Sequence, residues 1–166
     1  MIAVEDDRPQ VVKSLGISMG PLDALMNTGD IELIEAELLK LPQVDCPLVH
    51  IFVPGLYVRE VFMPANSLII GHEHLTQHLN QILTGSAVVM MNGKPFQVEA
   101  PFTFESEPGV RKVIYIKEDM RWQTFHPNPE NIRDIERLSE RLIVKSPSFL
   151  HYFEDMKRLR ELIHIQ

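Results

Sequence analysis

The chain has 166 residues, of which 45% are apolar and 23% are charged, and its formal net charge is −7. These values are ordinary for one globular domain that buries a core. The acidic balance without a dense Lys/Arg cluster argues against nucleic-acid binding, and no apolar run reaches the ~18 residues that a membrane span needs. We expect no signal peptide at the polar N-terminus, and the single cysteine, Cys46, fits a cytoplasmic location.

Residues 1–47 are expected to form an N-terminal arm and one helix. Residues 1–20 show little periodicity, which predicts a loosely ordered arm. Asp30 then has the character of an N-cap, and Pro42 ends the helical pattern. The apolar face of the predicted helix consists of Ile31, Ile34, Leu38 and Leu41. Its acidic residues are expected on the outer face: Glu32, Glu35 and Glu37.

Residues 48–127 carry short β-branched and aromatic runs that are separated by turn signals. The Asn92-Gly93 pair suits the positive φ angles of a type I′ hairpin. Many short strands without intervening helices predict an all-β core, either an antiparallel sandwich or a barrel. The predicted strands are PLVHIFV, LYVREVFM, SLIIGHEH, HLNQILTG, AVVMM, PFQVEA, FTFES, VRKVIYI and RWQTFHP.

Residues 128–166 return to helical spacing and predict two C-terminal helices. Asn128-Pro129 is typical of the first helix start, and Ser146-Pro147 repeats the signal. The first helix is predicted from Ile132, Ile135, Leu138 and Leu142. The second has an apolar stripe of Phe149, Phe153 and Met156, which is expected to cover the barrel or to pair two subunits as a homodimer.

Three of the seven histidines, His72, His74 and His78, lie close together after an apolar run. On an extended strand His72 and His74 would leave by the same face, and His78 would arrive from the next strand. Imidazole is the commonest protein ligand for transition metals. The pattern therefore favours a site for one divalent transition metal, Fe, Mn, Zn or Ni. The alternative is that these are hydrogen-bonded polar residues at a barrel mouth.

The histidine segment resembles the first motif of the cupins. In that motif a Gly is followed by five residues, His-x-His, three or four residues, Glu, six residues and Gly. Here Asn66 stands at the first Gly position, His78 at the Glu position, and Gly85 closes the motif. The resemblance implies a cupin double-stranded β-helix barrel with one helix before it and two after it. The change from Glu to His still allows metal binding.

The second cupin motif, Pro-x-Gly, two residues, then His, is matched only loosely by EPGVRK. Lys112 stands at its histidine position, so the fourth ligand that the family would supply is absent there. The combination of HEH, HLN and LTG with EPGVRKV and EDMRWQT also resembles small single-domain cupins of tailed phages and prophages. That likeness implies a fold, a phage accessory role and a host-cytoplasmic location, but no assured reaction.

His126 is a further candidate for the same site. A hairpin turn centred on residues 117–120 would place Lys112 across from Phe125 and one step from His126. The hypothesis is that His126 fills the place that Lys112 leaves, so both are candidate cofactor-binding residues. The alternative is that His126-Pro127 merely ends the strand at the surface.

Two main classes of function follow, and the sequence does not decide whether the protein is an enzyme. The first is a small-ligand or host-protein binding module with a histidine-rich metal site. The second is a mononuclear metal enzyme, an oxygenase, isomerase or lyase, acting on a small polar substrate, because three ligands leave coordination positions open. A structural role in a virion is a third interpretation that depends only on the phage resemblance.

Overall fold

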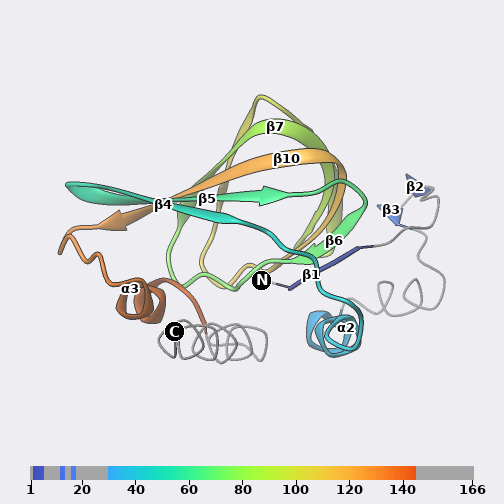
Figure 1. The fold of residues 1–166 in the computed structure, drawn as a ribbon, viewed down its shortest axis with the longest axis horizontal. Coiled ribbons are helices and arrows are strands. Elements are labelled where there is room, and N and C mark those ends of the chain that lie inside the picture. The colour runs from blue at the N-terminus through green and yellow to red at the C-terminus, as the bar shows by residue number, and fades with distance from the viewer. Residues whose placement is uncertain (1, 6–11, 14–15, 18–29, 145–166) are drawn as a thin grey trace, which may run out of the picture.

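A computed structural model describes residues 2–5, 12–13, 16–17 and 30–144 of the chain, with side chains described from residue 30 onward. Antiparallel strands curl into a barrel, and two helices lie on one side of it (Figure 1). The strands are β1 (Ile2–Glu5), β2 (Val12–Lys13), β3 (Gly16–Ile17), β4 (Leu48–Val53), β5 (Gly55–Met63), β6 (Ser67–Ile70), β7 (His78–Met91), β8 (Lys94–Glu99), β9 (Phe102–Ser106) and β10 (Lys112–Asn128). The helices are α2 (Ile31–Leu38) and α3 (Ile135–Leu142).

The main sheet has eight strands in the order β1-β6-β10-β5-β4, and β7 joins it by pairing with β10, β8 and β9. This arrangement confirms the predicted all-β core with flanking helices. The Asn92-Gly93 turn between β7 and β8 has the positive φ angles of 52° and 71° that the sequence predicts. No helix among the described residues is long and apolar enough to cross a membrane.

Two predicted strand breaks are wrong, because β7 and β10 are long and continuous. β7 has 14 residues and joins the predicted runs HLNQILTG and AVVMM. β10 has 17 residues and runs through residues 117–120, where a hairpin turn was expected. These residues form register irregularities against β7 rather than a reversal. Lys117, Glu118 and Asp119 are exposed while Met120 is buried, so the polar run is a solvent-facing bend in one strand.

Gly85 is required where the two long strands bend past each other. Its φ is +85°, and a Cβ atom there would lie 2.5 Å from the carbonyl oxygen of Asp119 and 2.7 Å from that of Glu118. Both obstacles are backbone atoms of β10, which cannot rotate away. The glycine that closes the histidine motif therefore allows β7 to bend against β10 at close range.

The N-terminal arm contains short strands that the sequence did not predict. Residues 2–5 form β1, which pairs antiparallel with β6. The predicted helix α2 begins as expected, since the Asp30 side chain accepts a hydrogen bond of 3.0 Å from the Leu33 backbone. The helix ends at Leu38, and Leu41 is 41% exposed and lies outside it.

The expected solvent position of Glu35 is wrong. Its side chain is 2% exposed, and one carboxylate oxygen lies 2.8 Å from the Arg111 guanidinium. The reason is that Ile34 and Leu38 pack on the outer face of the barrel, against Leu68 and Ile70, and carry Glu35 to the edge of that contact. The ion pair lets α2 bury a charge without leaving it uncompensated.

The first C-terminal helix begins later than the sequence predicts. Asn128 still belongs to β10, and its side-chain amide exchanges hydrogen bonds of 3.0 and 2.9 Å with the Ile132 backbone. The N-cap of α3 is Asp134. Asn128 therefore ends a strand with a closed turn instead of starting a helix. The predicted second helix, with Phe149, Phe153 and Met156, lies outside the described residues.

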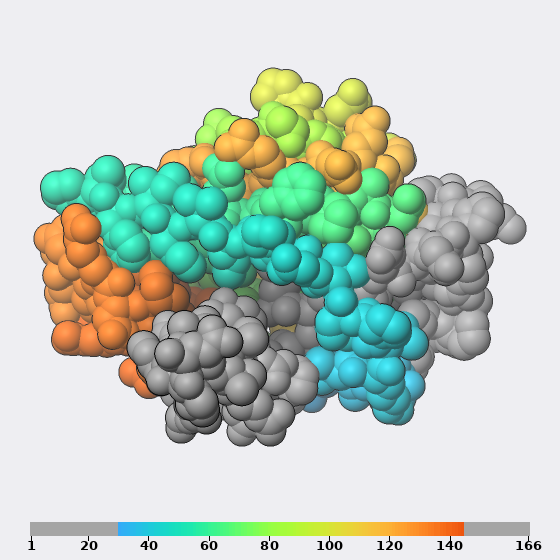
Figure 2. Space-filling view, viewed as in Figure 1, coloured from blue at the N-terminus to red at the C-terminus, as the bar shows by residue number. Residues whose placement is uncertain are grey.

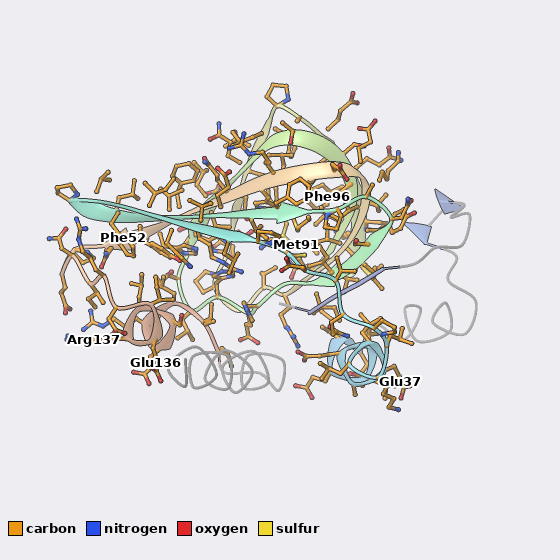
Figure 3. The ribbon with its side chains drawn as sticks, viewed as in Figure 1. Glu37, Phe52, Met91, Phe96, Glu136 and Arg137 are labelled. Atoms are coloured by element: carbon orange, nitrogen blue, oxygen red, sulfur yellow. The ribbon has the colours of Figure 1, made fainter. Side chains whose placement is uncertain are left out.

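The barrel interior is apolar over one part of its length. In Figure 3 Met91 and Phe96 lie toward the side of α2, whereas Phe52 lies at the opposite end, near α3. The buried members of the main core are Val61, Met63, Ile69, Ile82, Ala87, Val89, Val98, Ile114, Ile116, Met120 and Trp122. Trp122, the single tryptophan of the chain, belongs to this cluster.

Replacing Gly85 by alanine is expected to destabilise the protein more than the same change at Gly93. Both residues have positive φ angles, which cost an L-residue about 1–2 kcal/mol, but a Cβ at Gly93 meets nothing within 4 Å. Chemical denaturation of the two variants measures the difference. Equal losses would show that the close approach of β10 at Gly85 is not a constraint.

Replacing Glu35 by glutamine is expected to lower the free energy of unfolding by about 3 kcal/mol, because it leaves the Arg111 cation uncompensated in a buried position. The matched control is Glu37→Gln on the outer side of the same helix, visible in Figure 3. Glu37 pairs with Lys40, whose side chain is 66% exposed, so its loss should cost under about 1 kcal/mol. Urea denaturation of both variants tests this, and similar effects would contradict it.

Candidate functional site

The barrel interior changes from apolar to polar toward one end. Side chains two residues apart on a strand share a face, so Arg59, Asn80 and Thr124 face inward like Val61, Ile82 and Trp122. The strand register places Thr124 beside both Arg59 and Asn80. At the next inward-facing positions toward this end, Tyr57 pairs with His126, and His78 pairs with Ser106. Two histidines thus arrive at the same level from β10 and β7.

Three imidazole rings meet at this level: His74, His78 and His126. The ring centroids of His74 and His78 are 4.1 Å apart. The His126 centroid lies 5.0 Å from that of His74 and 4.9 Å from that of His78. All three residues are buried, and His126 is only 1% exposed, so it does not end its strand at the surface. We call these three side chains the histidine cluster.

Each ring of the histidine cluster has one buried nitrogen without a hydrogen-bond partner: His74 Nδ1, His78 Nε2 and His126 Nδ1. His78 Nδ1 lies 3.1 Å from the Thr76 carbonyl oxygen, which can only accept, so Nδ1 is the protonated nitrogen. The His78 Nε2 atom is then a free lone pair. Buried polar atoms are rarely left unsatisfied, so three in one place indicate a position that ordered water or a bound group satisfies.

Burial keeps the histidine cluster neutral at physiological pH. It lowers the pKa of His78 to about 4 and that of His126 to about 3, and lowers the pKa of His74 further. Smaller contributions in the same direction come from Lys112 on all three rings and from Arg59 on His74 and His126. Neutral imidazoles are the form in which histidine binds a metal or accepts a hydrogen bond.

The loop after β6 holds His74 in the cluster. The expected strand through His72 and His74 is wrong, because β6 ends at Ile70. His74 instead forms an isolated antiparallel bridge with Ile143, just after α3. Backbone hydrogen bonds flank this bridge, from Leu75 to Leu142 at 2.8 Å and from Val144 to Glu73 at 2.9 Å. Gly109 also donates to the His74 carbonyl at 2.9 Å. The position of His74 therefore depends on helix α3.

His72 lies two residues earlier in the same loop and is 8% exposed. Burial lowers its pKa, and nearby positive groups, Arg59 and Arg111 among them, act in the same direction. The ring contacts that define the cluster are made by His126 instead of His72. The predicted ligand role of His72 is not tested by this geometry and stays a prediction, as does that of the other histidines.

Lys112 occupies the start of β10 and faces inward with Ile114 and Ile116. The residue is 4% exposed, and burial lowers the pKa of its amine to about 8. Its backbone carbonyl accepts a 2.9 Å hydrogen bond from Gly71, which ties it to the histidine loop. Arg111, just before β10, donates to the Gly71 carbonyl at 3.2 Å, so two consecutive residues hold the N–H and the carbonyl of Gly71.

Several residues at the polar end were not predicted from the sequence. Tyr57 stacks on His126 with ring centroids 6.0 Å apart, and its hydroxyl lies 2.8 Å from His50 Nδ1. Asn80 accepts from the Trp122 indole at 3.1 Å and donates to Ser106 at 2.9 Å, closing the boundary with the apolar core. The sequence signal that could have identified Tyr57 and Arg59 was the alternation of side chains along the strand LYVREVFM. It puts both residues on the same face as Val61.

The donor set fits a transition metal, but the rings are not arranged as a formed metal centre. Among residues 30–144, no three His, Cys, Asp or Glu side chains are placed to hold a metal ion. The His74 and His126 rings are stacked at 18°, so they present faces to each other and not converging lone pairs. Three neutral imidazoles, each with an unsatisfied nitrogen, have the right chemistry, and rotation of the ring planes would be needed to bring the nitrogens together.

No family model and no curated protein matches the sequence. Solved structures with a similar fold include cupins. One is an RmlC-like cupin with a double-stranded β-helix fold from Methanocaldococcus jannaschii, at 9% identity over 52% of this chain and 84% of that chain, with a TM-score of 0.43. The Cnp3 cupin domain of Schizosaccharomyces pombe is 20% identical over 63% of this chain and 79% of that chain, with a TM-score of 0.43. A Bacteroides fragilis cupin is 12% identical over 56% of this chain and 86% of that chain, with a TM-score of 0.43. These likenesses concern the fold and carry nothing about ligand or reaction.

The neutral histidine cluster predicts that metal-free protein loses stability on acidification. The unfolded chain binds protons on these histidines near pH 6.5, whereas folded His78 and His126 stay neutral until about pH 4 and 3. The free energy of unfolding should therefore fall as pH drops from 7 to 4, by up to ~1.4 kcal/mol per pH unit for each histidine.

The measurement is urea denaturation of chelator-treated protein at several pH values. Because carboxylates also contribute to the slope, the comparison is with a His78→Gln/His126→Gln double variant, which should have a shallower dependence on pH. A slope that does not change in the double variant would contradict burial of these rings as neutral groups.

Proposed function

We propose that the protein is a cupin-type small-ligand-binding protein whose polar barrel end binds one divalent transition metal. The observation that carries the proposal is the set of three unpartnered imidazole nitrogens on His74, His78 and His126. Their rings come from a loop, β7 and β10, and their centroids lie 4.1–5.0 Å apart, so rotation of the ring planes could direct the nitrogens to one ion. Such an ion would satisfy all three nitrogens at once.

The surroundings support a site of this kind. The Thr76 carbonyl orients the His78 ring through Nδ1, which is the support that a metal-binding histidine usually has on its second nitrogen. A bound ion would keep coordination positions open, where a small ligand could attach. The apolar core around Trp122 fills the barrel on the other side of the site.

A mononuclear metal enzyme is the second candidate function. The specific feature in its favour is Lys112, whose amine lies near the histidine cluster and has its pKa lowered to about 8 by burial. An amine with this pKa can exchange a proton near neutral pH. The described interior supplies no second acid or base of comparable position, so binding is the better-supported function. A phage accessory role, cytoplasmic location and a homodimer rest on the sequence alone and stay predictions.

The metal proposal predicts about one equivalent of bound metal in protein reconstituted with Fe²⁺, Mn²⁺, Zn²⁺ or Ni²⁺ and then desalted. A His74→Ala/His126→Ala double variant should lose it, because one imidazole cannot hold the ion. Elemental analysis by mass spectrometry measures the content, and circular dichroism verifies the fold.

Two single variants sharpen this test. His50→Ala is the matched control, since His50 bonds to Tyr57 and lies outside the cluster, and it should retain the metal. His72→Ala separates the two possible ligand sets: loss of metal assigns His72 as a ligand with His74 and His78, and retention assigns His126. Metal content that is unchanged in the His74/His126 double variant would refute the proposal.

A further inference from the structure

The polar end of the barrel carries one buried lysine, Lys112, that has no carboxylate partner among the residues that the structure describes. Lys112 is 4% exposed, and its amine makes no hydrogen bond or ion pair with the described residues. Arg59 faces the same interior, two residues before Val61. Both act on the histidine cluster as positive charges, lowering the pKa of His74 and His126. Among the described residues, no acid contributes to these two pKa shifts.

The described strands explain why none of their own acids faces this interior. The five acidic residues of strands β4–β10 alternate outward or lie at the exposed bend of β10. Glu60, for example, pairs with Arg121 and Gln123 on the outer face. Glu105 lies opposite Leu79 and contacts Gln77 in an exposed position. The acidic positions are Glu60, Glu99, Glu105, Glu118 and Asp119.

A buried cation without a partner is costly, because it loses its hydration and gains no opposite charge. The neighbouring residue Arg111 is a paired cation, because its guanidinium lies 2.8 Å from the Glu35 carboxylate. The Lys112 side chain leaves by the opposite face, toward the barrel interior, and has no such partner among the described residues. A divalent ion on three neutral histidines would raise the excess of positive charge further.

We infer that the ligand of this site is a small carboxylic acid, bound as its anion against the Lys112 amine beside the histidine cluster. This inference deepens the proposed function by naming the class of ligand. A carboxylate supplies the missing negative charge and can accept hydrogen bonds from the lysine amine. It also has oxygen atoms that can occupy an open position on a metal.

Phosphate is less well matched to the site. Phosphate sites commonly use backbone N–H groups at a free helix N-terminus or in a glycine-rich loop. The two described helices are capped by their own acids, Asp30 on α2 and Asp134 on α3. Those caps place negative charge where a phosphate would bind, which leaves side-chain cations as the main attraction.

The experiment is calorimetric titration at pH 7 with succinate and benzoate, and with succinamide and benzamide as uncharged controls of the same shape. At least one acid should bind saturably, and its amide should bind at least tenfold more weakly. Lys112→Met should weaken the acid at least tenfold, whereas Lys112→Arg should keep most of the affinity. The matched control is Lys117→Met on the exposed bend of the same strand, which should change nothing.

Thermal unfolding provides a second readout that does not depend on choosing the right acid. In ligand-free protein, Lys112→Met should be at least as stable as wild type, because it removes an uncompensated buried cation. A clear loss of stability would mean that Lys112 has a structural partner and would overturn the inference. Binding of neither acid, equal binding of the amides, or tighter binding of inorganic phosphate than of either acid would also overturn it.

The titrations are run on metal-loaded and on chelator-treated protein, which separates this inference from the metal proposal. Lys112-dependent binding of an acid to protein that takes up no metal supports the inference while the metal proposal fails. Stoichiometric metal without Lys112-dependent binding of an acid overturns the inference alone.

Discussion

The structure depends on one long strand that crosses the whole barrel. β10 pairs with β5, β6 and β7, and its inward side chains pass from Lys112 through the apolar core to His126. The bend near residues 117–120 lets this strand change partners while keeping its inward face inward. Gly85 on β7 makes the bend possible, because no other residue leaves room for the β10 backbone. Core packing and site geometry are therefore set by the same strand.

The histidine cluster is assembled from two kinds of element, paired strands and a loop. His78 and His126 lie on paired strands, whereas His74 lies in a loop held by hydrogen bonds to the end of α3 and to Gly109. The Arg111–Glu35 pair and the Arg111 bond to Gly71 connect that loop to α2 as well. In the space-filling view α2 (blue) and α3 (orange) border the barrel at separated positions (Figure 2). The two helices thus support the site from outside, without contributing a side chain to the cluster.

The chemistry of the polar end follows from what the interior lacks. Apolar side chains fill the part of the barrel around Trp122, and Asn80 marks the boundary by satisfying the indole N–H. Beyond it the inward positions of the described strands carry imidazoles and cations and no acid. Such an environment keeps the histidines neutral, which preserves their lone pairs, and leaves positive charge for an anion to compensate. Metal binding and carboxylate binding are thus separate consequences of one arrangement.

The sequence by itself determined the all-β core, the Asp30 cap, the Asn92-Gly93 turn and the crowding of candidate ligands, because these depend on alternation and local backbone preference. It also nominated His126 and Lys112, although through a hairpin that does not exist. Only the tertiary structure decided that residues 117–120 continue a strand, that Glu35 is buried, and that His126 meets His74 and His78. Local polarity cannot distinguish a turn from a bulge, and the partner of a buried charge is set by contacts between segments far apart in the chain.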